Sequence, residues 1–440
     1  MLVEFSVGNY RSFQAPVTLS MVAANISSRS DILDTHNVFN AGSRLQLLTS
    51  AAIYGANASG KSNLIRAMAF MQRFVLTSSR ESQITEAIPV EPFRLNTATE
   101  SQPSFFEIVF LIKNIQYRYG FQVQRQRVVA EWLYRLGKAR EMKLFDRTDD
   151  QIKITPRNFP EGRGLEERTR PNALFLSVVA QFNGETAITV LQWFQQLLIN
   201  TGIDSDHDLF LAATSFENSA YRLDIEQFIK RLDIGIEHFE VEYLPIAIPK
   251  NMFANMPAEI VELITRLQKT MDATRQSIKT VHQRFNDEGQ TQDTVMFDLE
   301  EHESAGTQRL FGLAPALVHA LRHGVVLVID ELDARIHPNL VTELIRLFHS
   351  STTNPHHAQL LFTTHNTNLL SARLFRRDQV WFVEKSRQGA SDLYSLAEYR
   401  LNDQKMVRND ASFEKDYVLG RYGAIPFIGN LDELLRGNSG

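Results

Sequence analysis

The 440-residue chain contains no cysteine, which excludes disulfide bonds, cysteine-ligated zinc and thiol catalysis. No apolar run reaches the roughly 18 residues that a membrane-spanning helix needs. The N-terminus alternates like a strand and lacks the basic and apolar blocks of a secretory signal. A net charge of −5 gives no overall positive field that would attract nucleic acid. Binding of nucleic acid by a local basic patch is still an open alternative. We therefore expect a cytoplasmic protein without a membrane partner.

A phosphate-binding loop is the clearest pattern that the chain contains. Residues 55–62 read Gly-Ala-Asn-Ala-Ser-Gly-Lys-Ser and fit G-x-x-x-x-G-K-[ST]. A predicted strand over 48–54 precedes the loop, and a predicted helix follows from residue 63. Backbone N–H groups and the helix dipole would face phosphate oxygens. The predicted ligands are ATP and Mg²⁺, with Lys61 on the β- and γ-phosphates, Ser62 on the metal, and the loop completed by Gly55, Asn57, Ala58, Ser59, Gly60 and Asn63.

A second pattern lies roughly 270 residues after Lys61, a separation too long for one strand–helix–strand crossover. Residues 325–331 read Val-Val-Leu-Val-Ile-Asp-Glu, which is typical of a strand buried on both faces of a parallel sheet. Asp330 would hold Mg²⁺ through water, and Glu331 would polarise the attacking water. A large insertion is therefore expected inside the nucleotide-binding sheet.

Two more patterns flank this strand. Residues 303–308 read Glu-Ser-Ala-Gly-Thr-Gln before a predicted helix over 309–322, and a Ser-x-Gly at a helix start can bind an anion. Residues 360–365 read Leu-Leu-Phe-Thr-Thr-His, a predicted strand that ends in a histidine. The order of the patterns resembles ABC-type ATPase heads, and more closely heads of the SMC and RecF type. The opening residues 5–13, Phe-Ser-Val-Gly-Asn-Tyr-Arg-Ser-Phe, are similar to the N-[FY]-[KR]-S-F start of those proteins.

The resemblance extends to one branch of these heads. Residues 303–310 are similar to its ESxGTxRL motif, and Asp330-Glu331-Leu332-Asp333 with His337-Pro338 fits as well. So do residues 378–385 and 420–427. Together they resemble bacterial abortive-infection ATPases of the AbiL/RloA type, relatives of the ATPase half of OLD-family nucleases. Two departures are Ala305, where the branch more often has an acid, and residues 91–95, which lack the expected Q-loop glutamine.

The resemblance implies an α/β fold, an ABC-type P-loop ATPase head with an antiparallel β-lobe and a helical insertion. Two heads would form a homodimer by stacking head-to-tail on ATP, with higher assembly left open. Ser304 and Gly306 of one head would contact the γ-phosphate held by the other. Glu331 would act as the general base, His365 would sense the γ-phosphate, and Arg11 of the opening motif would belong to the nucleotide site.

Three domains are expected along the chain. Residues 1–155 would form the N-terminal ATPase lobe, 156–294 a helical insertion with a short helical arm, and 295–440 the C-terminal ATPase lobe. Strands over 105–112, 116–123, 128–136 and 143–145 would build the β-lobe, and residues 172–231 would be mostly helical. A helix is predicted over 259–285, because Ile260, Leu263, Ile264, Leu267, Met271, Ile278, Val281 and Phe285 recur at three-, four- and seven-residue spacing.

Two charged groups are weaker signals. Asp204, Asp206, His207 and Asp208 crowd together like metal ligands, but acidic loop segments are usually solvated. Basic residues between Arg125 and Lys143 could line a nucleic-acid surface, although a solvated strand face is favoured.

Three functions remain open. The first is a slow anti-phage defence ATPase that senses or scaffolds and leaves killing to a separate effector; an ATP-locked scaffold without turnover is a variant of it. The second is an OLD-like ATPase–nuclease, which would need a D-x-D pair after the head; none follows His365. The third is a RecF- or SMC-like DNA-repair ATPase, which would predict a marked basic surface.

Overall fold

The computed structural model describes residues 1–28, 30–42, 45–80, 83, 86–137, 140–202, 216, 222–232, 235–245, 274–371, 373–400, 406–408 and 411–425. The chain divides into two compact units. Unit 1 comprises Met1–Gly202, Ala320–Asp333 and Pro338–Gly440, and unit 2 comprises Ile203–His319 and Ala334–His337. The three-domain division expected above stays a prediction.

A six-stranded sheet carries the phosphate-binding loop in unit 1. Its order is β11-β15-β16-β5-β17-β18, and every neighbouring pair is parallel except β17 with β18. Every residue of β5, β15 and β16 is buried, as their continuous apolar sequences predict. The strands are β11 (Leu198–Asn200), β15 (Val326–Ile329), β16 (Gln359–Thr363), β5 (Ser50–Tyr54), β17 (Val380–Lys385) and β18 (Ser391–Ser395).

Helices α2 (Lys61–Thr77) and α11 (Pro338–His349) pack on this sheet. Leu64 and Ile65 of α2 share one continuous core with residues of both large sheets of unit 1. Helix α11 buries an apolar stripe made by Val341, Leu344, Ile345 and Phe348, which recur at helical spacing.

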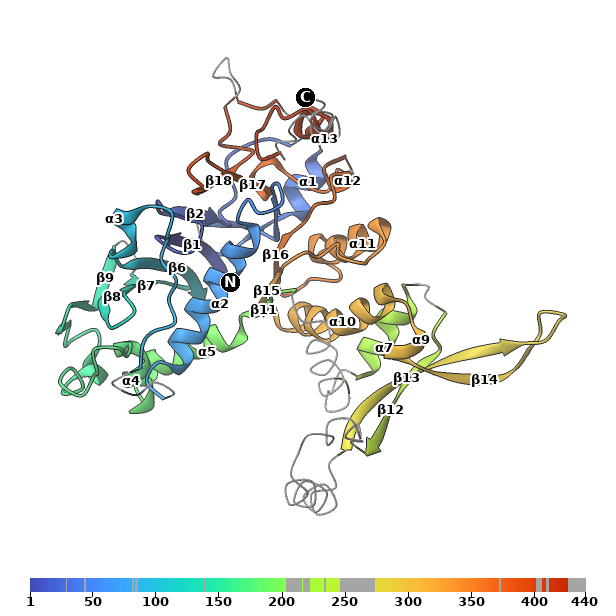
Figure 1. The fold of residues 1–440 in the computed structure, drawn as a ribbon, viewed down its shortest axis with the longest axis horizontal. Helices are drawn as coiled ribbons and strands as arrows, with labels where there is room; N and C mark the ends of the chain where they lie inside the picture. Colours follow the sequence, from blue (N-terminus) through green and yellow to red (C-terminus); the bar gives the residue numbers. More distant parts are fainter. Residues whose placement is uncertain are drawn as a thin grey trace, which may run out of the picture. The chain divides into compact units, whose positions relative to one another are not determined.

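The second large sheet of unit 1 is antiparallel and has the order β10-β9-β8-β7-β6-β1-β2 (Figure 1). This is the predicted β-lobe, and the strands predicted at 105–112, 116–123, 128–136 and 143–145 are confirmed. Helices α4 (Phe175–Gln181) and α5 (Glu185–Gln196) then confirm the helical start of residues 172–231. The strands are β1 (Leu2–Gly8), β2 (Val17–Ser20), β6 (Ser104–Ile112), β7 (Ile115–Val123), β8 (Val128–Leu136), β9 (Glu141–Thr148) and β10 (Gln151–Ile154).

Short elements complete unit 1. They are α1 (Asp31–His36), β3 (Val38–Asn40), β4 (Gln46–Leu48), α3 (Thr97–Glu100), η1 (Pro160–Gly162), α12 (Asn368–Ser371), η3 (Arg377–Gln379) and α13 (Phe413–Val418). Among the described residues, no helix is long and apolar enough to cross a membrane.

A buried glutamate joins the β-lobe to α4. Glu131 of β8 is fully buried and accepts hydrogen bonds from the backbone N–H groups of Phe175 and Leu176, at 2.6 and 3.0 Å, and from the Tyr119 hydroxyl at 3.0 Å. The two N–H groups belong to the first turn of α4, where no intrahelical partner is available. Burial raises the pKa of Glu131, while the Leu176 N–H and Arg147 act in the opposite direction.

We expect Glu131→Ala to lower the free energy of unfolding by about 3 kcal/mol, because three buried donors lose their acceptor. The measurement is chemical denaturation. Glu141→Ala is the control, since Glu141 binds Arg118 on the same sheet from an exposed position, and about 1 kcal/mol is expected there. Equal losses in the two variants would contradict a special role of Glu131.

Unit 2 contains a three-stranded antiparallel sheet with the order β12-β13-β14 (Figure 1). Its core joins Phe239 and Ile278 of the sheet to Phe311, Ala314 and Val318 of α10. The elements are α7 (Arg222–Lys230), β12 (His238–Pro245), β13 (Thr274–Phe285), β14 (Thr291–Asp298), α9 (Leu299–His302) and α10 (Ala305–His323).

The helix predicted over 259–285 is wrong over its last part, because Thr274–Phe285 is strand β13, and so the insertion is not purely helical. Its first part, 259–273, lies outside the described residues, as does the cluster at Asp204–Asp208. Ile278, Val281 and Phe285 fit helical spacing by coincidence. Asn286 and Gly289 lie in the turn to β14, and Gly289 has a φ of +77°. This turn signal outweighs the helical spacing of the apolar residues.

Candidate functional site

The phosphate-binding loop connects β5 to α2 at the carboxyl edge of the parallel sheet. Asn57 and Ala58 are exposed at its tip, and Ala58 has a φ of +59°. Gly60 is the residue before α2 and has a φ of +120°, a conformation that L side chains rarely adopt. Ser62 is half-buried in the first turn of α2, where its N–H has no intrahelical partner. The loop therefore presents backbone donors and a helix N-terminus to the same place.

Both glycines of the loop are sites of close approach. A Cβ on Gly60 would lie 2.4 Å from Ser391 Oγ and 2.7 Å from Ser12 Oγ, and one on Gly55 would lie 2.4 Å from the Val383 carbonyl oxygen. Ser391 Oγ donates to the Ser59 carbonyl oxygen, so a residue of β18 stabilises the phosphate-binding loop. This packing leaves no room for a side chain at either glycine.

Lys61 folds back onto the loop. Its Nζ donates to the carbonyl oxygens of Gly55 at 2.9 Å and Ala56 at 3.1 Å, and the residue is only 6% exposed. Burial lowers the pKa of Lys61, and the negative charges of Asp330 and Glu331 raise it. The ammonium group thus stands close to the carboxylates that end β15.

The order of strands in the sheet explains why Lys61 lies close to these carboxylates. β16 lies between β15 and β5, so the carboxyl ends of all three parallel strands reach one edge of the sheet. Asp330, Glu331 and His365, distant from Lys61 along the chain, are gathered there. The same edge holds Asp333, whose Oδ2 accepts from the backbone N–H of His365 at 3.3 Å.

Thr363, at the end of β16, binds both carboxyl-bearing residues. Its Oγ1 donates to Asp330 Oδ1 at 2.5 Å and accepts from the backbone N–H of Glu331 at 2.7 Å. Thr363 and Asp330 are buried, whereas Glu331 is exposed with a φ of +52°. The threonine therefore orients one carboxylate and fixes the strained backbone that presents the other.

We expect Thr363→Val to slow ATP turnover by about 10- to 100-fold, because a hydrogen bond to a charged group contributes about 1.5–3 kcal/mol. Steady-state phosphate release would measure this effect. Thr363→Ser retains the hydroxyl and should stay within a few-fold of wild type. A valine variant as fast as the serine variant would show that the hydroxyl is dispensable.

His365 follows β16 at the same edge. Partial burial and the charge of Lys61 lower its pKa, while Asp333 and Glu331 oppose them. The lowered pKa favours the neutral imidazole, which can donate or accept a hydrogen bond. Its exposed position is suited to contact with a bound group rather than with the core.

The opening motif lies beside the loop. Asn63 Nδ2 donates to Ser12 Oγ at 2.8 Å, and the Ser391 N–H donates to the Ser12 carbonyl at 2.7 Å. Arg11 forms an ion pair with Glu91 at 2.7 Å, and its backbone N–H donates to the Glu91 carbonyl at 2.8 Å. The motif thus supports the loop, and Glu91 binds the arginine predicted for the nucleotide.

Ser304 and Gly306 lie in unit 2, at the start of α10. Ser304 Oγ accepts from the Thr307 N–H at 3.1 Å, which makes it the cap of that helix. A Cβ on Gly306 would lie 2.6 Å from the Arg335 carbonyl oxygen. The Ser-x-Gly helix start predicted from the sequence is present, with Ser304 exposed.

The residues of unit 1 fit a magnesium nucleotide. Ser59 Oγ and Asp333 Oδ1 are buried without a hydrogen-bond partner among the described residues. Such atoms at this edge fit a site that binds a polar ligand. Within the described part of the chain no three His, Asp or Glu side chains form a metal cluster. Ser62 carries a hydroxyl and Asp330 a carboxylate, and these are oxygen donors of the kind that Mg²⁺ takes beside phosphates and water. Ser62 and Asp330 are the residues that would hold it.

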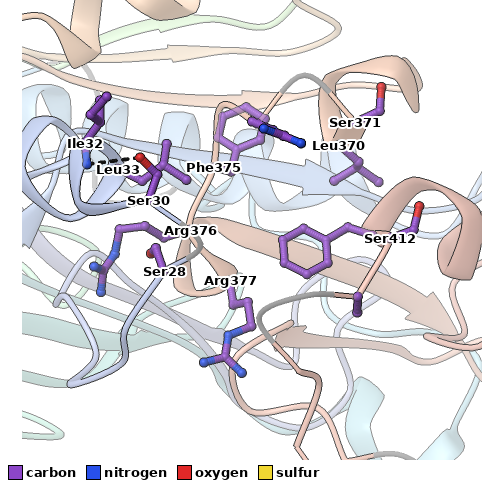
Figure 2. A pocket seen from close by; sticks show the side chains of 13 residues that line it. Ser28, Ser30, Ile32, Leu33, Leu370, Ser371, Phe375, Arg376, Arg377 and Ser412 are labelled. Carbon is purple, nitrogen blue, oxygen red and sulfur yellow. Dashed lines mark hydrogen bonds between the residues drawn. The ribbon is translucent and has the colours of Figure 1, made fainter.

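A cavity of about 620 Å³ lies apart from these residues, between α1, α12 and the segment 411–413 (Figure 2). Arg373, Arg376 and Arg377 line it together with serines and apolar side chains. Arg376 is buried and forms ion pairs with Asp34 and Asp378. Its charge therefore ties α1 to η3 and is not free for an anion.

The sheet edge, with its loop, lysine and strand-end carboxylates, defines a P-loop nucleotide-binding protein of the α/β class. Residues 50–371 match the family described as "AAA domain, putative AbiEii toxin, Type IV TA system", and the chain belongs to this family. No curated protein sequence matches the chain.

The solved structures that are similar to the chain include two SMC heads. One is the "SmcHead bound to the C-winged helix domain of ScpA", with 13% identity, a TM-score of 0.42 and coverage of 90% of this chain and 97% of that one. The other is the "SMC head domain from Thermotoga maritima", with 14% identity, a TM-score of 0.37 and coverage of 90% and 98%. The predicted fold class, an ABC-type α/β head with an antiparallel β-lobe, is confirmed by the two sheets of unit 1, apart from the helical insertion corrected above.

Proposed function

We propose that the chain is an ATP-binding and ATP-hydrolysing switch that acts in bacterial anti-phage defence and governs a separate effector. The observation that carries the ATPase part is the gathering of Lys61, Asp330, Glu331 and His365 at one sheet edge, around Thr363. The family description, which names a putative AbiEii toxin, supports the defence part. The branch motifs at 303–310 and 420–427 support the AbiL/RloA type.

Each residue has a defined task in this proposal. The loop N–H groups and Lys61 bind the phosphates, and bound Mg²⁺ acts as a Lewis acid on them. Glu331 takes the proton of the attacking water, and Thr363 holds Glu331 and Asp330 in place. His365 reports whether a γ-phosphate is present.

The switch itself is a homodimer in this proposal. Ser304 and Gly306 of one protomer contact the γ-phosphate held by the other, so ATP favours the closed pair and product release favours the open one. The effector would respond to this change of population. Higher assembly is compatible with the same contacts.

We expect slow ATP turnover and an ATP-Mg²⁺-dependent doubling of the mass in solution, measured by phosphate release and light scattering. Ser304→Ala should bind ATP with unchanged affinity yet stay monomeric, because its serine serves the partner's nucleotide. Ser371→Ala, an exposed serine on α12, is the control. A fixed mass and no turnover in wild type would contradict the switch.

The defence role needs a cellular test. Bacteria that express the wild-type protein with its neighbouring genes should resist phage infection, measured as plaque formation, and a variant without ATP binding should lose that protection. Equal plaque counts with and without the wild-type protein, over a broad phage panel, would contradict the defence role and leave the ATPase proposal intact.

A further inference from the structure

Glu303, directly before Ser304, is bound by the sheet of unit 2. Its Oε1 accepts from Thr280 Oγ1 at 2.6 Å and lies 2.6 Å from His282 Nε2. Thr280 and His282 are two residues apart in β13, so they share one face of the strand. Ile278, on the same face, belongs to the core with α10. Glu303 is thus held on the core side of the sheet, with its side chain only 12% exposed.

The segment that leads to Glu303 is fixed to the same strand. Asp298 caps α9 by accepting from the backbone N–H groups of Glu300 and Glu301. Its other oxygen accepts from Ser277 Oγ at 2.7 Å and Lys279 Nζ at 3.0 Å. The start of the segment therefore stays with β13 whatever happens at Glu303.

The segment is also fixed to α10. Gln308 Nε2 donates to the carbonyl oxygens of Leu299, Glu300 and Glu303, at 3.0, 2.9 and 3.2 Å. Ser304 is the single residue between Glu303 and α10, so its place depends on both neighbours. Of the two carboxylates of this segment that bind β13, Glu303 is the one next to Ser304.

We propose that Thr280 and His282 are positioning residues for Ser304, acting through Glu303. This inference rests on the function proposed above, in which Ser304 contacts a γ-phosphate in the closed dimer. Without its partners the Glu303 carboxylate would be left half-buried and unpaired, and the turn would move to hydrate it. Ser304 would then leave its place at the start of α10. The sheet of unit 2 thereby affects the rate at which the closed dimer hydrolyses ATP. It does not affect the affinity of the phosphate-binding loop for ATP.

The test compares three quantities for each variant: the Tm, the ATP dissociation constant of the monomer, and kcat at saturating ATP. Glu303→Ala and His282→Ala should lower kcat by about tenfold, with the dissociation constant within about twofold of wild type. Glu303→Gln keeps an acceptor for the Thr280 hydroxyl and should recover most of the rate. His238→Ala is the matched control, because this partly exposed histidine of β12 pairs with exposed Glu240.

Two further variants separate failure of this inference from failure of the switch. Wild-type kcat in both Glu303→Ala and His282→Ala, with a slow Ser304→Ala, would overturn the positioning role and leave the switch standing. Wild-type kcat in Ser304→Ala would instead remove the switch. The double variant Glu303→Ala/Ser304→Ala should be no slower than Ser304→Ala alone. Full additivity, or equal losses of Tm and kcat in Glu303→Gln and Glu303→Ala, would give Glu303 a structural role only and overturn the proposal.

Discussion

Glu331→Gln is expected to slow ATP hydrolysis by about 10²- to 10⁴-fold while ATP binding is kept, because a positioned general base contributes that much. Glutamine has the same shape but cannot take a proton from water. The Glu331 backbone, with a φ of +52°, is held by the Thr363 hydroxyl, so the side chain of the variant should keep its direction. Single-turnover hydrolysis measures the rate, and fluorescent nucleotide titration measures the affinity.

The same variant should accumulate the closed dimer, since ATP stays bound and is not consumed. Light scattering with ATP-Mg²⁺ would show this as a larger dimer fraction than in wild type. Glu343→Gln is the control, because Glu343 is an exposed residue of α11 that forms an ion pair with Arg346. Unchanged turnover in Glu331→Gln would remove Glu331 from the role of general base.

Lys61→Met is expected to weaken ATP binding by about 100-fold and to abolish turnover at millimolar ATP. Methionine is similar in length but carries no charge and no N–H donor. Asp330, Glu331 and Asp333 all act on Lys61 electrostatically, so without the ammonium group a triphosphate would meet a negatively charged edge. Losing charged hydrogen bonds to phosphate accounts for about 3 kcal/mol.

Isothermal calorimetry with ATP-Mg²⁺ would measure this loss. Lys153→Met, at an exposed position of β10, is the control for a general change of charge. The folded state should tolerate Lys61→Met, because among the described residues the hydrogen bonds of Lys61 Nζ go to the loop carbonyls of Gly55 and Ala56. Wild-type affinity in the variant would contradict the assignment of the phosphate-binding loop.

Much of the nucleotide-binding half could be predicted because its signals are local. The buried strands at 50–54, 326–329 and 359–363 are largely apolar runs, and the loop between β5 and α2 fits the defined motif G-x-x-x-x-G-K-[ST]. The β-lobe strands alternate with turns and are equally plain. Strand β11 was not predicted, since Leu198–Asn200 is too short to show a pattern and is a strand only because it pairs with β15.

Supporting residues escaped prediction for a different reason. Thr363, Ser12 and Ser391 are common residue types with no pattern around them that indicates a site. In the sequence, Thr363 is only one residue of the strand-end Thr-Thr-His. The role of each depends on a residue far away in the chain. Ser391 donates a hydrogen bond to Ser59, and Thr363 donates one to Asp330. Such partnerships depend on strand order, which no local signal contains.

The inserted region shows where periodicity misleads. Residues 274–285 carry apolar side chains at helical spacing, yet β-branched residues and the Asn286–Gly289 turn favour the hairpin that forms. Packing of Phe239 and Ile278 on Phe311 stabilises the strand, and that contact joins segments distant in sequence. The binding of Glu303 by Thr280 and His282 follows from this strand and could not be foreseen from a helix.

Sequence alone therefore determined the chemistry of this protein: a phosphate-binding loop, a strand-end carboxylate pair, a strand-end histidine and a Ser-x-Gly helix start. Each is a short segment whose residue types and flanking periodicity suffice to predict it. Tertiary structure alone decided which side chains support them, because hydrogen-bond partners such as Thr363 and Glu303 are set by the order of strands in a sheet. Which strands become neighbours depends on how the faces of the whole sheet are buried. No single segment of the sequence contains that information.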